Sequence, residues 1–244
     1  MSRLETLGVV VARGRSKRLP RKMLRTLAGH PLLAFMARAA LASRLDRIVL
    51  STDDDEIAEA AARYGLEAPF RRPAALADDF VTNDKVLRHA LDWIEAQSGR
   101  APDVVVLLQP TAPFTTAADI DACLSVLERT DANLCFTATA VTEQPHWMFV
   151  PQENGELTLL MDGHLSGDRQ HTQKLPRYLH PSGAVWAIRT AALRETGRVY
   201  VAPMRAVEVP AERAVDIDTE VDLLFAEAIA NRFGFLPAAS VARP

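Results

Sequence analysis

Three short, uninterrupted apolar segments divide the first half of the chain. They occupy residues 7–12, 47–51 and 103–108, and β-branched side chains are frequent in them. Such segments are typical of strands that are buried on both faces of a parallel sheet. Apolar residues at helical spacing, at 31–42 and 86–95, precede the second and third segments. The alternation predicts an α/β domain with a mostly parallel sheet that helices cover on both sides.

The same patterns predict the elements of the remaining chain. They are helices at 53–63, about 117–127 and 219–233, and strands at 134–140 and 183–188. In the last helix, Val221, Leu224, Phe225 and Ala228 recur at helical spacing, and we expect them to form its buried face.

Residues 142–181 depart from this regular alternation. The segment contains Pro145, Pro151, Pro176 and Pro181, and its turn signal is Glu-Asn-Gly-Glu at 153–156. Prolines and Asn-Gly pairs interrupt regular structure and favour turns. We expect an irregular hairpin arm that is inserted into a single domain spanning residues 1–244.

Composition and charge exclude several classes of protein. The 244 residues carry a formal net charge of -3, so no global field attracts nucleic acid or an anionic membrane. The two cysteines, Cys123 and Cys135, are too few for a disulfide framework. No apolar segment approaches the ~20 residues that cross a bilayer. We therefore expect a soluble, cytoplasmic protein without nucleic-acid or membrane partners.

A basic loop directly follows the first predicted strand. Seven of the thirteen residues from Arg13 to Arg25 are Arg or Lys, and none is acidic. Ligands of α/β sheets bind beyond the carboxyl ends of the strands, where this loop lies. Gly14 would let the backbone approach a ligand, while Ser16, Lys17 and Lys22 suit a polyphosphate. Phosphate binding is therefore favoured over a solvated turn or a nucleic-acid patch, although the loop is neither a Walker A motif nor a dinucleotide fingerprint.

Two aspartates precede the last predicted helix. In an extended segment, Asp216 and Asp218 share one side, so their carboxylates could converge on one hard cation such as Mg²⁺. Asp218 could equally serve as the N-cap of the helix. Spacing alone does not choose between these two roles. The histidines show no zinc-binding spacing, and no nucleophile motif is present.

Six segments, in this order, resemble the acylneuraminate cytidylyltransferases, the CMP-sialic acid synthetase family. They are ARGRSKRLPRK at 12–22, STDDDEIA at 51–58, RPxxLAxD at 72–79, LQPTAP at 108–113, QxLP at 173–176 and DIDTEVDL at 216–223. The resemblance implies a Rossmann-like nucleotidyltransferase fold. It also implies an Mg²⁺-dependent enzyme that joins CTP to a sugar acid, releasing pyrophosphate and forming a CMP-sugar.

The resemblance also assigns roles to individual residues. The triphosphate loop comprises Arg13, Ser16, Lys17 and Lys22, of which Lys22 and Arg13 assist the transfer. The cytosine contacts are Arg72 and Asn83; the acceptor residues are Gln109, Gln173 and Tyr200; the Mg²⁺ ligands are Asp216 and Asp218. Asp218 is also expected to help activate the attacking hydroxyl. The arm matches the family's dimerisation element, which would place Gln173 in the active site of the neighbouring subunit.

The chain departs from the family pattern mainly on the acceptor side. The departures are Met23, Thr115, Thr172, His180 and Ser182. We therefore expect the acceptor to be a nonulosonic acid related to N-acetylneuraminate, or another anionic metabolite, with Arg169 and Arg177 supplying a shifted cation. The alternative is a nucleotide-binding protein of the same fold that has lost catalysis.

Overall fold

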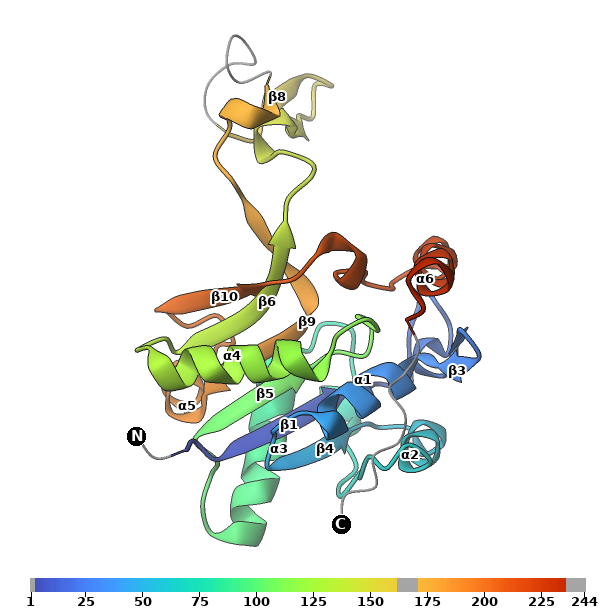
Figure 1. The fold of residues 1–244 in the computed structure, drawn as a ribbon, viewed down its shortest axis with the longest axis vertical. Helices are drawn as coiled ribbons and strands as arrows, with labels where there is room; N and C mark the ends of the chain where they lie inside the picture. Colours follow the sequence, from blue (N-terminus) through green and yellow to red (C-terminus); the bar gives the residue numbers. More distant parts are fainter. Residues whose placement is uncertain (1–2, 162–170, 236–244) are drawn as a thin grey trace.

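A six-stranded sheet forms the centre of the computed structural model, which describes residues 3–161 and 171–235 (Figure 1). The strand order is β10-β6-β9-β5-β1-β4. The strands are β1 (Thr6–Val11), β4 (Arg47–Ser51), β5 (Val104–Leu108), β6 (Leu134–Ala140), β9 (Leu179–Arg189) and β10 (Met204–Glu208). Only β9 runs antiparallel to its neighbours, β5 and β6. The predicted mostly parallel sheet is therefore confirmed.

Helices cover both faces of the sheet. They are α1 (Leu32–Ala42), α2 (Asp55–Ala62), α3 (Asn83–Ser98), α4 (Ala117–Arg129), α5 (Thr190–Thr196) and α6 (Glu220–Phe233). Residues of α1, α2 and α4 join one apolar core with the sheet, and residues of α3 and α5 join another. Burial of these two faces stabilises the arrangement, since roughly 25 cal/mol is gained per Å² of apolar surface removed from water.

A third, smaller core joins α6 to the start of the chain. Leu27 in strand β2 (Thr26–Leu27), which pairs with β3 (His30–Pro31), lies in this core with Leu223 and Ile217. The short 3₁₀ helix η1 (Lys22–Leu24) precedes the β2–β3 pair. This packing brings the basic loop after β1 next to the segment that leads into α6.

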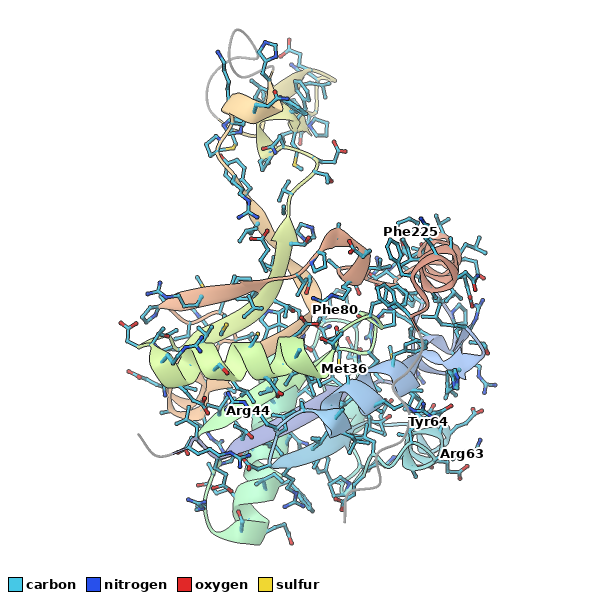
Figure 2. The ribbon with its side chains drawn as sticks, viewed as in Figure 1. Met36, Arg44, Arg63, Tyr64, Phe80 and Phe225 are labelled. Carbon is cyan, nitrogen blue, oxygen red and sulfur yellow. The ribbon has the colours of Figure 1, made fainter. Side chains whose placement is uncertain are left out.

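The predicted buried face of α6 is wrong. Leu223, Ala226 and Ala230 face the core, whereas Val221 and Phe225 are 73% and 55% exposed, and Phe225 points outward (Figure 2). The buried residues and the residues that we predicted both recur at helical spacing, so the sequence pattern is that of a helix with two apolar faces. The contact with the β2–β3 region selects the face that is buried.

The segment between β6 and β9 projects from the sheet as an arm (Figure 1). Its described part contains the paired strands β7 (Phe149–Pro151) and β8 (Leu157–Leu159), and the 3₁₀ helices η3 (Pro145–Trp147) and η5 (Thr172–Lys174). The exposed apolar residues on and beside the arm are Met148, Phe149, Val150, Leu157, Leu160 and Leu179. In the described parts of the chain, no helix is long and apolar enough to span a membrane.

Candidate active site

A polar cavity of about 340 Å³ opens at the carboxyl ends of β1 and β5. Arg13 and Lys22 line it from the loop after β1, and Gln109 lines it from the residue after β5. Asp216 and Asp218 complete it from the segment before α6. The fold therefore brings the two polar clusters of the sequence together, as expected for a ligand site of a parallel sheet.

The basic loop is fixed at its start by the aspartates after β4. The backbone N–H of Gly14 donates to Asp53 Oδ1 over 2.9 Å. A Cβ atom at Gly14 would lie 2.5 Å from Asp54 Oδ2, a separation that real side chains do not tolerate. The Asp54 side chain therefore disfavours any larger residue here, and Gly14 also lines a cavity of about 620 Å³, so its expected role in letting the backbone approach a ligand stays a prediction.

Asp218 forms ion pairs with two basic side chains, Lys22 and Arg18, at the other end of the loop. Lys22 Nζ lies 2.7 Å from Asp218 Oδ1, and Arg18 Nη2 lies 2.6 Å from Asp218 Oδ2. Lys22 also donates to the carbonyl of Ile217 over 3.1 Å. Burial alone would raise the pKa of Asp218, but the hydrogen bonds and charges of Lys22 and Arg18 outweigh it and lower the pKa. Asp218 is therefore anionic at neutral pH.

Asp216 has a different electrostatic environment. Burial raises its pKa, the negative charge of Asp218 adds to the rise, and a hydrogen bond with Thr111 opposes it. The backbone N–H of Ile217 donates to the carbonyl of Thr111 over 2.8 Å, which ties the aspartate segment to the loop after β5. A Cβ on Gly183, whose φ is +74°, would lie 3.2 Å from Asp216 Cγ. The carboxylate thus lies beside both the loop after β5 and strand β9.

The N-cap role considered for Asp218 is wrong. Thr219 is the N-cap of α6, and its hydroxyl accepts from the backbone N–H of Asp222 over 3.3 Å. The Asp222 carboxylate accepts in return from the backbone N–H groups of Asp218 and Thr219, over 3.0 and 2.7 Å. This capping box satisfies the helix start and leaves the Asp218 side chain facing the cavity.

Arg72 and Asn83 lie on the side of the cavity next to α3. Arg72 is 5% exposed, and its Nε donates to Ser51 Oγ over 3.0 Å. Burial lowers the pKa of Arg72 to about 10, repulsion from Arg13 adds to this, and Asp53 opposes it. Arg72 therefore remains charged at neutral pH. Asn83 is the first residue of α3, whose N-terminal end faces the cavity.

Comparisons with known proteins identify the family. The family model described as cytidylyltransferase matches residues 7–180. The chain belongs to the cytidylyltransferase family. It is 30% identical to a pseudaminic acid cytidylyltransferase of Campylobacter jejuni (strain 81-176), over 92% of this chain and 95% of the relative. It is also 30% identical, with the same coverage, to a CMP-N,N'-diacetyllegionaminic acid synthase of Legionella pneumophila.

The fold agrees with this family. A solved CMP:2-keto-3-deoxy-manno-octonic acid synthetase complexed with CTP superposes with a TM-score of 0.68 at 18% identity. The alignment covers 94% of this chain and 99% of the solved one. The sequence-based expectation of a nucleotidyltransferase fold is thus confirmed.

Three of the predicted site residues lie outside this cavity. Lys17 lines an adjoining cavity of about 620 Å³, which shares Arg15, Ser16, Asp78 and Asp79 with the first. Gln173 is exposed on the arm, and Tyr200 lies beside Trp186, whose Nε1 is 3.4 Å from the tyrosine hydroxyl. Neither of the two lines the cavity that contains Gln109, and their acceptor roles stay predictions.

Among the described side chains, the positions that depart from the family pattern contribute no cation to the cavity. The hydroxyl of buried Thr115 donates to the carbonyl of Ala112 over 2.9 Å, and that of Ser182 donates to Thr137 Oγ1 over 2.7 Å. Arg177 forms an ion pair with Glu208. Arg169, the other expected substitute, lies outside the described residues.

Sequence analysis missed three groups of the candidate site. Arg18 lies in the basic loop but was assigned no role, although its ion pair with Asp218 depends on a contact across 200 positions. Thr111 lies within the recognised motif LQPTAP, and Asp79 is the last residue of the recognised motif RPxxLAxD. Their positions in the motifs were the available signal, whereas their partners follow only from the fold.

Proposed function

We propose that this chain transfers the cytidylyl group of CTP to a hydroxyl of a nonulosonic acid and releases pyrophosphate. The observation that carries the proposal is the convergence of Arg13, Lys22, Asp216 and Asp218 on one cavity at the carboxyl ends of β1 and β5. Nucleotidyl transfer needs in-line positioning and neutralised phosphate oxygens, and no covalent nucleophile. The family match and the named relatives support CTP as the donor.

The proposed reaction is a single displacement at the α-phosphorus. An acceptor oxygen forms a bond to this phosphorus as the bond to the β-phosphate oxygen breaks, and pyrophosphate leaves with the electron pair. The acceptor hydroxyl loses its proton to solvent. Arg13 and Lys22 stabilise the charge that develops on the phosphate oxygens, and Ser16 supplies a hydrogen bond. Arg72 and Asn83 hold the cytosine at the α3 side of the cavity.

Asp216 and Asp218 fit a magnesium ion. Both carboxylates line the same cavity, neither caps α6, and Asp216 has no cation within hydrogen-bond distance among the described residues. Carboxylate oxygens together with substrate phosphates are the usual Mg²⁺ environment. When bound, the ion would neutralise phosphate oxygens during the transfer. Asp218, anionic at neutral pH, is the carboxylate that we place nearest the acceptor hydroxyl.

The acceptor that we propose is a nonulosonic acid of the pseudaminic or legionaminic acid type. Both named curated relatives act on such acids, and their similarity covers more than nine-tenths of this chain. The substituted positions Met23, Thr115 and Ser182 support an acceptor other than ordinary N-acetylneuraminate. These positions carry apolar or hydroxyl side chains, two of which are satisfied within the protein.

We also propose a cytoplasmic homodimer assembled through the arm. The apolar side chains of β7 and β8 are exposed in the single chain, and an isolated pair of short strands is marginally stable in water. A second copy would cover these residues and would bring its Gln173 toward the acceptor end of the cavity.

Mass spectrometry of the products tests the proposed function. The purified chain is incubated with CTP, Mg²⁺ and, separately, pseudaminic acid, N,N'-diacetyllegionaminic acid or N-acetylneuraminic acid. We expect the CMP-sugar and pyrophosphate with at least one of the first two acids. Efficient turnover of N-acetylneuraminic acid would overturn the altered acceptor, and the absence of any CMP-linked product would overturn the transferase.

A further inference from the structure

The carboxylate of Asp79 joins two of the cations that we assign to the triphosphate. Arg13 Nη1 lies 2.7 Å from Asp79 Oδ1, and Lys17 Nζ lies 2.6 Å from Asp79 Oδ2. Each oxygen of the carboxylate thus has a cation of its own. A phosphate group binds such cations through the same N–H donors, so the carboxylate and a phosphate compete for them.

Asp79 lies where the two cavities meet. Together with Arg15, Ser16 and Asp78, it lines both the 340 Å³ cavity and the adjoining 620 Å³ cavity. The first cavity contains Lys22, Asp216 and Asp218, and the second contains Lys17. A chain of phosphates that begins beside Lys22 and reaches Lys17 would run along the residues that line both cavities, and Asp79 is one of them.

Little besides these ion pairs holds this part of the loop. Asp79 lies between η2 (Ala74–Leu76) and α3, and within the described residues its backbone forms no hydrogen bond. The next residue, Phe80, is 91% exposed and belongs to none of the apolar cores. The nearest anchor is Asp78, which accepts hydrogen bonds from Phe80 N at its side chain and from Val81 N at its carbonyl. Apart from the ion pairs with Arg13 and Lys17, no hydrogen bond of Asp79 within the described residues opposes its movement away from these cations.

We propose that Asp79 sets the affinity for polyphosphates by occupying the place of a phosphate in the nucleotide-free chain. The inference rests on the proposed function. CTP displaces the carboxylate from Arg13 and Lys17, whereas CMP carries one phosphate and leaves the bridge in place. After transfer, the carboxylate returns to the two cations and favours the departure of pyrophosphate. Asp79 thereby distinguishes polyphosphates from the monophosphate.

Binding calorimetry on Asp79→Asn and Asp78→Asn tests this role. Asn keeps the shape of Asp79 but removes the charge that pairs with both cations, so we expect CTP and inorganic pyrophosphate to bind about tenfold more tightly. Asp78→Asn is the matched control, because it removes the same charge from the same loop, and Asp78 forms no ion pair within the described residues. We expect it to change these affinities about twofold or less, and CMP affinity to stay unchanged in both variants.

An unchanged or weaker affinity of Asp79→Asn for pyrophosphate would overturn the proposal, as would an equal gain in Asp78→Asn. The pyrophosphate titration separates this outcome from a failure of the proposed function. If the wild-type chain binds no CTP, the nucleotidyl transfer is refuted, while the ratio of pyrophosphate affinities still decides whether Asp79 competes with phosphate.

Discussion

Lys22 Nζ donates to Asp218 Oδ1 over 2.7 Å, although 196 positions separate the two residues. This contact joins the loop after β1 to the segment before α6. It places a cation beside a carboxylate that we assign to the metal, and both side chains are partly shielded, with exposures of 11% and 33%. Because charges interact more strongly where water is excluded, this position suits stabilisation of a phosphoryl transition state.

Removal of the Lys22 charge should slow the transfer step strongly. We expect Lys22→Met to lower kcat by about 10²–10³-fold, since one preorganised charge contact contributes roughly that much. Arg18→Met is the matched control, because Arg18 pairs with the same carboxylate from a side chain that is 66% exposed. A pyrophosphate-release assay measures both variants. An equal loss in both would contradict a special role for Lys22.

Replacement of Asp218 should separate catalysis from nucleotide binding. We expect Asp218→Ala to abolish pyrophosphate release while CTP binding is retained, because Arg13, Lys17 and Arg72 remain. Calorimetry with CTP and the release assay together make this test. Unchanged turnover in Asp218→Ala would refute its role, and wild-type binding of CTP without any turnover would favour the non-catalytic alternative.

The Asp216 carboxylate should be needed for activity although it does not stabilise the metal-free fold. Desolvation raises the pKa of Asp216, so its ionised form is less favourable in the fold than in the unfolded chain, and we expect Asp216→Asn to melt at the same or a higher temperature than wild type in metal-free buffer near pH 7. The same variant should lose at least about 10²-fold in activity. Differential scanning calorimetry supplies the melting temperature. A clear decrease would show that the ionised Asp216 stabilises the metal-free fold.

The raised pKa of Asp216 also predicts a pH dependence. The folded chain holds the Asp216 proton more tightly than the unfolded chain does, so its contribution to stability falls as the pH rises through the window above 3.8. Conversely, Mg²⁺ affinity should fall as the pH decreases through this window, because the protonated carboxyl is a poor ligand. Mg²⁺ titration by calorimetry between pH 4 and 7 measures the effect, and an affinity independent of pH would contradict it.

The arm should control the oligomeric state. We expect Phe149→Asp, which puts a charge on the exposed arm strand β7, to convert a dimer into a monomer. Val221→Asp places the same charge on exposed α6 and should leave the dimer intact. Size-exclusion chromatography with light scattering distinguishes the species. A monomeric wild type at working concentration would remove the proposed role of Gln173 in the neighbouring subunit.

The sequence predicts the sheet and the location of the site because both follow from short-range patterns. Apolar runs mark β1, β4 and β5, and the carboxyl ends of parallel strands meet at one edge, where Arg13 and Gln109 lie. Strand β10 escaped detection because its residues are mostly exposed and form no apolar run. The buried face of α6 could not be chosen from periodicity, since both of its candidate faces are apolar.

The electrostatic partners in the site could not be predicted from the sequence. Asp79 is one of three acidic residues at 78, 79 and 84, and nothing local indicates that it bridges Arg13 and Lys17. Likewise, the pKa of Asp216 depends on desolvation and on a hydrogen bond with Thr111, which lies more than a hundred positions away in the loop after β5. Such contacts arise from tertiary packing, beyond the reach of residue spacing.

A crystal structure with CTP and Mg²⁺ tests the central claim most directly. We predict that the triphosphate contacts Arg13 and Lys22, and that a metal ion bridges its oxygens to Asp216 and Asp218. A nucleotide bound elsewhere, with the basic loop and the two aspartates untouched, would contradict the account.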